Sequence, residues 1–460
     1  MPRLSARPVM AAALAACILG GAFQPATQAT SVRPPAFKFD DYTLPNGLRV
    51  ILLEDHSTPV VHVQLWYHVG SKDERTGRTG FAHLFEHMMF KGSRNVPPEA
   101  HISYIASVGG QSNAYTTEDT TVFWESVPAQ YLPLTLWLEA DRMASLRIEE
   151  AVFKTEREVV KEERRQRVDN QPYGRLSEII YENAFTTHTY KHPIIGSMAD
   201  LEAASIEDVR EFHRTYYRPD NATLVIAGDF EPAVARSLIE KEFSKVPKAT
   251  TPLTRQIPVE PARTKELRLT LEEDWPLPVV VVAYPITYDG HSDSYPLHIA
   301  AKVLSDGTSS RIYQRLVYKE RLALSASGQA NLIEHPNLFY TVAIVAPGHT
   351  PEQVSNALID ELDKLVREPI AVRELERSKN QFARDYVIGR QTVQQKAQSL
   401  AHAVVLHKGD VGTADNEFDI FQNITAADVQ RVAKTYFTPQ SRMVLTIMPR
   451  GQRPAVGGGQ

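Results

Sequence analysis

Residues 205–219 read SIEDVREFHRTYYRP, and residues 425–439 read TAADVQRVAKTYFTP. The two stretches share an Asp-Val pair near their start and a Thr-Tyr-aromatic-x-Pro pattern at their end. A strand-like sequence follows each of them, ATLVI from residue 222 and RMVLTI from residue 442. All three matches keep one offset of about 220 residues, which indicates an internal duplication rather than coincidence.

The duplication predicts an α+β fold made of two homologous αβ halves. We expect each half to form a mostly antiparallel sheet flanked by helices. Asn46-Gly47 separates two apolar runs and predicts a β-hairpin, and a further strand is expected over residues 60–69. The Pro- and Thr-rich stretch at residues 247–262 is typical of an extended linker. The predicted domains are therefore residues 38–246 and 263–450, followed by a disordered tail at 451–460.

The amino terminus is typical of an export signal. Arg3 and Arg7 precede an apolar run over residues 9–23, and the small residues before and at Ala29 offer a cleavage site. We expect removal of residues 1–29 and export to the periplasm. A membrane anchor is the alternative, but the run is short for a bilayer span. Because no later segment approaches about 18 consecutive apolar residues, the mature body is expected to be soluble.

Cysteine and charge restrict the chemistry further. The single cysteine, Cys17, lies inside the signal, where it also resembles a lipoprotein cleavage box; lipidation is the less favoured alternative. A mature chain cut after Ala29 has no cysteine, so any zinc must be bound by His and carboxylate ligands. The net charge of −5, from 50 basic and 55 acidic residues, gives no electrostatic case for nucleic-acid binding.

The candidate chemistry lies in residues 83–87, which read HLFEH. A helix is expected to begin near Phe81. His83 and His87 are i and i+4 on it, so both imidazoles can reach one metal ion. Glu86 lies on the same face, where its carboxylate can accept a proton from a water at the metal. The alternative is a helix with two unrelated histidines, since such a short match arises by chance.

A catalytic zinc needs a third protein ligand and an open position. The helix expected from Glu150 to about residue 168 is the best source of that ligand. Glu-rich runs more often mark a solvated helix face, and the pattern by itself does not choose among the four candidates, Glu156, Glu158, Glu162 and Glu163.

Three motifs resemble the pitrilysin family of metallopeptidases, over nearly the whole mature chain. They are FAHLFEHMMFKGS at residues 81–93, EREVVKEE at 156–163 and GQSNAYT at 110–116. The resemblance implies a zinc endopeptidase with one Zn²⁺ per chain, because the second half has no counterpart of the metal motif. It implies Glu163 as the third ligand, with Glu162 as the alternative one residue away, and Glu156 as an assisting glutamate.

The third motif implies an edge strand that binds the substrate. In the family, the peptide adds to this strand through main-chain hydrogen bonds, and the residues carried over as contacts are Asn113 and Ala114. The natural substrates implied are peptides or unfolded polypeptides.

One departure from the family bears on the partner. An Arg and a Tyr that bind the substrate carbonyl in the family fall on Val317 and Leu324, and neither side chain donates a hydrogen bond. Arg311 and Tyr318 have the right spacing but lie six residues too early, so we interpret them as structural. We therefore expect a heterodimer in which a homologous zinc-less subunit supplies Arg and Tyr, with a homodimer as the alternative. The competing functional classes are a non-catalytic structural or binding subunit and a closed structural metal site.

Overall fold

The computed structural model describes residues 33–451. The predicted signal at residues 1–29, Cys17 within it, and residues 452–460 of the predicted tail lie outside the described residues. Within residues 33–451, no helix is long and apolar enough to cross a membrane.

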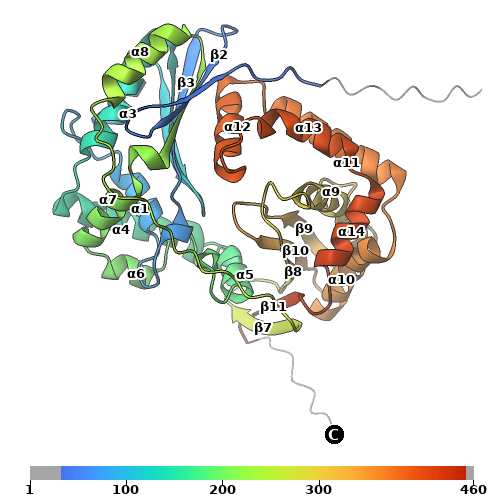
Figure 1. Ribbon diagram of the computed structural model, residues 1–460. Coiled ribbons are helices and arrows are strands. Elements are labelled where there is room, and N and C mark those ends of the chain that lie inside the picture. Colours follow the sequence, from blue (N-terminus) through green and yellow to red (C-terminus); the bar gives the residue numbers. More distant parts are fainter. Residues whose placement is uncertain (1–32, 452–460) are drawn as a thin grey trace, which may run out of the picture. The chain divides into compact units, whose positions relative to one another are not determined.

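The first half contains a six-stranded sheet, in the order β1-β2-β6-β3-β5-β4. Figure 1 labels two of its strands, β2 and β3. The predicted hairpin at Asn46-Gly47 is confirmed, because β1 and β2 pair antiparallel on either side of it. Only the β2–β6 pair is parallel. β6 is buried along its whole length, as its apolar sequence predicts. The strands are β1 (Asp40–Thr43), β2 (Arg49–Glu54), β3 (Val60–Tyr67), β4 (Gln111–Thr116), β5 (Thr121–Pro128) and β6 (Ala222–Gly228).

Eight α-helices accompany this sheet in the described part of the first half. The apolar faces of all but the fifth pack with the sheet into one core that includes Leu65, Phe85 and Leu224. The helices are α1 (Phe81–Met88), α2 (Ala100–Ser107), α3 (Leu132–Ser145), α4 (Glu150–Arg164), α5 (Leu176–Ala184), α6 (Met198–Ala203), α7 (Ile206–Tyr216) and α8 (Pro232–Phe243). A π-helical turn, η3 (Arg165–Asp169), extends α4, and a 3-10 turn, η1 (Ser71–Asp73), follows β3.

The second half has a five-stranded sheet in the order β7-β11-β8-β10-β9, with its own core. Its strands are β7 (Leu267–Glu273), β8 (Val279–Ile286), β9 (Ala323–Ala330), β10 (Asn337–Val345) and β11 (Met443–Pro449). Its helices are α9 (Ser294–Ser305), α10 (Pro351–Arg367), α11 (Val372–Ile388), α12 (Val393–Leu406), α13 (Thr413–Asn423) and α14 (Ala426–Tyr436), with a π-helical segment, η6 (Tyr313–Lys319).

The sequence repeat is a structural repeat. α7 and α14 each begin with a capping box, formed by Ser205 and Asp208 in the first half and by Thr425 and Asp428 in the second. The strand after each helix pairs parallel with one strand of its sheet and antiparallel with another. The predicted α+β fold with two homologous halves and mostly antiparallel sheets is therefore confirmed.

Each half also contributes a helix to the sheet of the other half. α12 packs on β3 and β6 of the first sheet, where Leu400 joins a cluster with Ile51 and Trp66. α5 packs on the second sheet, where Ile180 joins a cluster with Val281 and Leu445. Both sheets are thus covered on two faces, and the halves share apolar contacts that the repeat alone does not predict.

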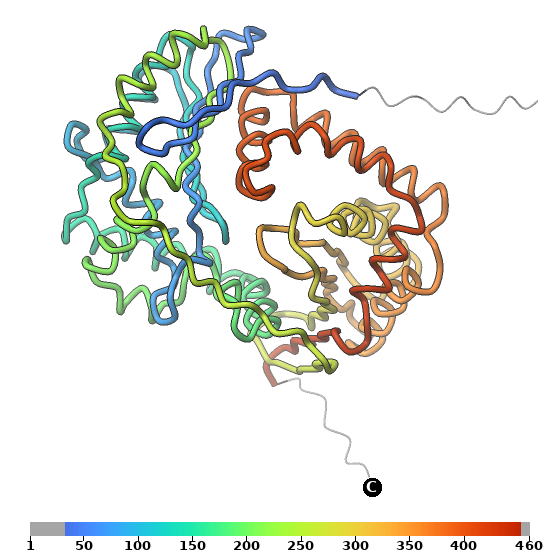
Figure 2. The backbone as a smooth tube through the Cα atoms, in the orientation of Figure 1, coloured from blue at the N-terminus to red at the C-terminus, as the bar shows by residue number. Residues whose placement is uncertain are grey.

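The stretch between α8 and β7 contains no helix or strand, and Figure 2 traces it as a smooth tube without helical coils. The domain boundaries at residues 246 and 263 remain a prediction.

Candidate active site and metal centre

The helix α1 is fixed at its amino end by a buried carboxylate. Glu74 accepts hydrogen bonds from the backbone N–H groups of Gly80 and Ala82, both at 2.8 Å. These donors belong to the first turn, whose backbone N–H groups have no acceptor within the helix. Gly80 has a φ of 88°, and a side chain there would collide with the carbonyl oxygen of Ile195. The start and direction of α1 are therefore strongly constrained.

The sequence of α1 separates its two faces. Leu84, Phe85 and Met88 are buried in the core, so the helical period turns His83 and His87 toward β4 and α4, which contact the helix. This orientation follows from the local pattern and agrees with the expected one.

His83, His87 and Glu163 converge at one point. Oε2 of Glu163 lies 3.8 Å from Nε2 of His83 and 3.3 Å from Nε2 of His87. One ligand atom from each of the three residues lies within 4.8 Å of the other two. Two imidazole nitrogens and one carboxylate oxygen form a donor set typical of catalytic zinc sites, which keep a fourth position open. The residues present therefore fit a zinc ion.

The electrostatics of the two histidines differ. Burial, together with the neighbouring His87, lowers the pKa of His83 to about 4, so this imidazole is neutral at pH 7. Burial also opposes the charged form of His87, but the neighbouring carboxylates of Glu156 and Glu163 raise its pKa to about 9. Because a metal binds the neutral ring, metal binding at His87 must displace a proton.

Glu86 lies beside His83, His87 and Glu163 but is not one of these three potential metal ligands. Its Oε2 accepts a hydrogen bond of 2.6 Å from Oγ1 of Thr116, at the end of β4. Burial raises the pKa of Glu86, and the bond from Thr116 opposes that rise. Glu86 lines a cavity of about 410 Å³ together with His83 and Glu163. A carboxylate so placed can exchange a proton with a molecule in the cavity.

The glutamates of α4 fall on different faces. Oε2 of Glu156 lies 3.6 Å from Nδ1 of His87, and its Oε1 lies 3.2 Å from Nζ of Lys91. Glu162 is exposed and pairs with Arg165, and Glu158 is exposed and pairs with Lys161. The structure therefore brings Glu156 and Glu163 to the histidines and leaves Glu158 and Glu162 on the outer face.

Arg167 was not singled out from the sequence. It extends from the π-helical turn η3, and its Nη1 lies 2.5 Å from Oε1 of Glu163. This contact occupies the carboxylate oxygen that faces away from the histidines. Its only sequence signal is the i, i+4 spacing from Glu163, which many surface ion pairs share.

β4 is the edge strand of the first sheet. It pairs with β5 on one side, and no described strand pairs with its other side. Ala114 lines the cavity beside Glu86. Asn113 accepts a hydrogen bond from the backbone N–H of Ala114 through its own side chain.

The second half brings no comparable group together. The three clusters of potential metal ligands found among residues 33–451 all lie in the first half. Val317 lies in η6, and Leu324, at the start of β9, is 57% exposed. Arg311 forms an ion pair with Glu374, whereas Tyr318 is exposed.

Comparisons with known proteins agree with this architecture. Residues 49–198 match the family described as Insulinase (Peptidase family M16), and residues 203–382 match the family described as Peptidase M16 inactive domain. The chain is 29% identical over 419 residues to the Zinc protease PqqE of Helicobacter pylori, an alignment that covers 90% of this chain and 93% of that protein. It is 24% identical to the Arabidopsis thaliana protein named Probable mitochondrial-processing peptidase subunit beta, over 88% of this chain and 78% of that protein.

The structural comparison gives the same result. The crystal structure of a protease from Helicobacter pylori matches with a TM-score of 0.86 and 29% identity, over 90% of this chain and all of that chain. Relatives named as zinc proteases therefore align over nearly the whole described chain, including both halves.

Proposed function

Because the chain belongs to the pitrilysin family of metallopeptidases, family M16, we propose that it is a zinc-dependent endopeptidase that hydrolyses peptides or unfolded polypeptides. The observation that carries the proposal is the convergence of His83, His87 and Glu163 beside the buried carboxylate of Glu86. Each chain would hold one zinc ion through these three ligands.

Zinc, when bound, supplies Lewis acidity toward water and toward a carbonyl group. Glu86 acts as the general base, taking a proton from the attacking water and later delivering it to the leaving amine. Thr116 holds Oε2 of Glu86 by its hydrogen bond, so we assign the transferred proton to Oε1. Burial favours the protonated form of Glu86, which suits a group that must carry a proton between two steps.

Glu156 acts through His87. Its carboxylate lies at Nδ1, the ring nitrogen opposite the one that faces Glu163. A carboxylate at the outer nitrogen fixes the orientation and tautomer of a metal-binding imidazole. Lys91 in turn contacts Glu156 and neutralises its charge.

The free edge of β4 supports a peptide substrate. An extended peptide pairs with an exposed strand edge through main-chain hydrogen bonds that do not depend on its sequence. Pairing along Asn113 and Ala114 would bring the peptide past Glu86, since Ala114 and Glu86 line the same cavity. This geometry favours unfolded chains over folded proteins.

The partner is proposed to be a homologous zinc-less subunit. Val317 and Leu324 occupy the positions where the family pattern has Arg and Tyr, and neither can donate a hydrogen bond to a developing oxyanion. A second chain with those residues would complete the site. A homodimer is the alternative, and a non-catalytic subunit is the alternative function.

The proposed location is the periplasm after export, with lipidation at Cys17 as the less favoured route.

A chelation experiment tests the proposed function. The chain purified without residues 1–29 is assayed on a set of quenched fluorescent peptides, before and after treatment with 1,10-phenanthroline. Hydrolysis should stop on chelation and return when one equivalent of Zn²⁺ is added. Hydrolysis that continues after complete removal of zinc would rule out the proposal, and so would a chain that binds no zinc.

A further inference from the structure

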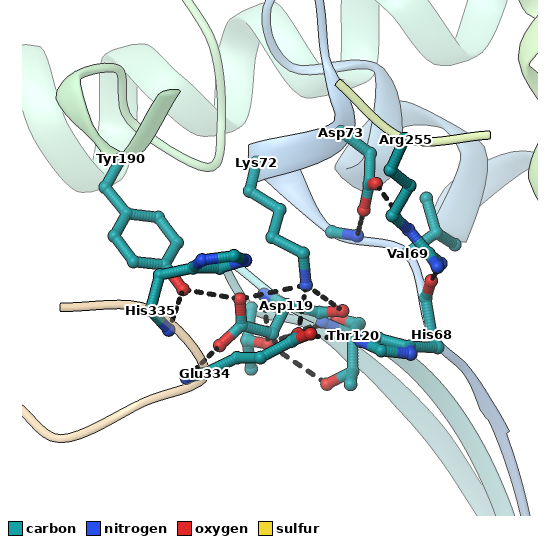
Figure 3. A network of polar contacts seen from close by, with 12 residues as sticks. His68, Val69, Lys72, Asp73, Asp119, Thr120, Tyr190, Arg255, Glu334 and His335 are labelled. Carbon is teal, nitrogen blue, oxygen red and sulfur yellow. Dashed lines mark hydrogen bonds and ion pairs between the residues drawn. The ribbon is translucent and has the colours of Figure 1, made fainter. Parts of the chain in front are cut away.

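The described residues of the second half form no cluster of three potential metal ligands, yet one loop of this half reaches the turn behind the proposed general base. Glu334 lies in the loop between β9 and β10, and its Oε2 lies 2.5 Å from Nζ of Lys72, in the first half. The Lys72 side chain is fully buried. A buried ammonium is costly unless it is paired, and the carboxylate of Glu334 is one of its two charged partners (Figure 3).

Asp119 is the other partner of Lys72, with Oδ1 at 3.0 Å from Nζ. The same oxygen accepts a hydrogen bond of 2.6 Å from the hydroxyl of Tyr190. Its Oδ2 accepts the backbone N–H of Glu334 at 3.1 Å. Asp119 is therefore held from three directions, two of which involve Lys72 and Glu334, as Figure 3 shows.

Asp119 lies in the turn that joins β4 to β5. The turn is closed by the backbone N–H of Thr117, which donates to the carbonyl of Thr120 at 2.8 Å. Its outer side packs against Gly70, where an added Cβ would lie 2.3 Å from the carbonyl oxygen of Glu118. The backbone N–H of Lys72 donates to that same carbonyl. The turn thus has little freedom while the cluster is intact.

The residue before this turn is Thr116, whose hydroxyl donates to Oε2 of Glu86. Side-chain contacts therefore join Glu334 to Lys72 and Asp119, the backbone of the turn joins Asp119 to Thr116, and the hydroxyl of Thr116 contacts Glu86. Within residues 33–451, Thr116 is the only side chain that forms a hydrogen bond with Glu86.

We propose that Glu334, together with Lys72 and Asp119, is a positioning residue for Glu86, acting through the turn at residues 117–120 and the hydroxyl of Thr116. The second half then has a role in catalysis that needs no metal and no contact with substrate. The kinetic part of this inference rests on the proposed peptidase function; the mechanical part does not.

The first test measures backbone mobility. In Glu334→Gln, which keeps the shape of the side chain and removes its charge, amide hydrogen exchange of residues 111–120 should rise at least about threefold above wild type. Glu376→Gln, at an exposed glutamate of α11, is the matched control and should leave that exchange unchanged. Exchange in 111–120 that is unaltered by Glu334→Gln overturns the proposal, whether or not the chain is a peptidase.

The second test is a double-mutant cycle in kcat. Thr116→Val should lower kcat with little change in KM, and Thr116→Ser should restore most of it. Glu334→Gln should lower kcat about tenfold in the wild type but less than about twofold in the Thr116→Val background, since both changes act on one contact. If the losses in kcat caused by Glu334→Gln and Thr116→Val are instead additive in the double variant, the proposal is overturned. A wild type without chelator-sensitive hydrolysis rejects the proposed function instead, and the exchange measurement then decides the inference.

A milder variant guards against misfolding. Tyr190→Phe keeps every charge and removes the two hydrogen bonds of the hydroxyl, one donated to Asp119 and one accepted from the backbone N–H of His335. It should raise exchange in the same residues to a smaller extent. If Glu334→Gln fails to fold, this variant decides: an unchanged exchange pattern in folded Tyr190→Phe contradicts the proposal.

Discussion

Oε2 of Glu163 lies 3.3 Å from Nε2 of His87, whereas the neighbouring Glu162 points outward and pairs with Arg165. Adjacent helix positions are separated by about 100° around the axis, so only one of the two carboxylates can face the histidines. This geometry distinguishes two residues that the sequence pattern left as alternatives.

The first prediction concerns these two glutamates. Glu163→Ala should lower the zinc content of the purified chain well below one per chain, since it removes one of three ligands. Glu162→Ala, at an exposed position, is the matched control and should keep full zinc. The metal content is measured by atomic emission. If the two variants give the reverse result, Glu162 is the ligand.

The second prediction concerns Glu156. Burial raises the pKa of this carboxyl, but the neighbouring His87 and Lys91 hold it below its usual value. Glu156→Gln should weaken zinc binding about 10- to 100-fold, because the ring of His87 loses its charged partner. Competition with a chromophoric chelator measures the change. Glu158→Gln, exposed on the same helix, should bind zinc as the wild type does; equal affinities of the two variants would remove Glu156 from the site.

The third prediction is a pH dependence of stability. Burial and the charge of Asp289 raise the pKa of Glu417 to about 7, above an unfolded value of about 4.3. A carboxyl group whose pKa is raised in the folded protein contributes to the free energy of unfolding. This contribution is complete below about pH 4 and is lost as the pH rises through 7. Since the side chain is 28% exposed, we expect a loss of about 1–3 kcal/mol, less than burial in a dry interior would give.

Glu417→Gln should therefore be more stable than the wild type at pH 8, with a difference that disappears toward pH 4. Chemical unfolding at several pH values measures it, and Glu376→Gln serves as a control that should follow the wild type throughout. A difference between Glu417→Gln and wild type that stays constant with pH would contradict the assignment.

The fourth prediction concerns the partner. Addition of a homologous zinc-less chain with Arg and Tyr at the positions equivalent to Val317 and Leu324 should raise kcat by at least about 10²–10³, the usual worth of one of the two oxyanion donors supplied. A partner in which those two residues are replaced by Val and Leu is the control. A chain that is as fast alone as in the mixture needs no such partner.

Much of the fold could be predicted because its signals are local. Asn46-Gly47 marks a turn that only a few residue pairs allow, and the capping residues Ser205 and Thr425 mark helix starts in both halves. The covering of each sheet by a helix from the other half was not predictable. Hydrophobic periodicity shows which face of α12 is buried, but it does not show which sheet that face meets.

The candidate site, like the fold, could be predicted from the sequence only in part. The spacing of His83 and His87 on one helix is sufficient to place two imidazoles together. The contacts of Glu86 with Thr116, and of Lys72 with Glu334, join segments far apart in the chain. Such contacts depend on the register of strands and on loop conformation, which single-residue patterns do not encode.

The most direct test of the central claim compares wild type with Glu86→Gln. The substitution keeps the size of the side chain and removes its ability to accept a proton, so general-base catalysis should be lost. We predict one zinc per chain in both proteins and hydrolysis of the fluorescent peptides reduced by at least about 10²–10⁴ in the variant. Undiminished hydrolysis by a zinc-loaded Glu86→Gln would contradict the account.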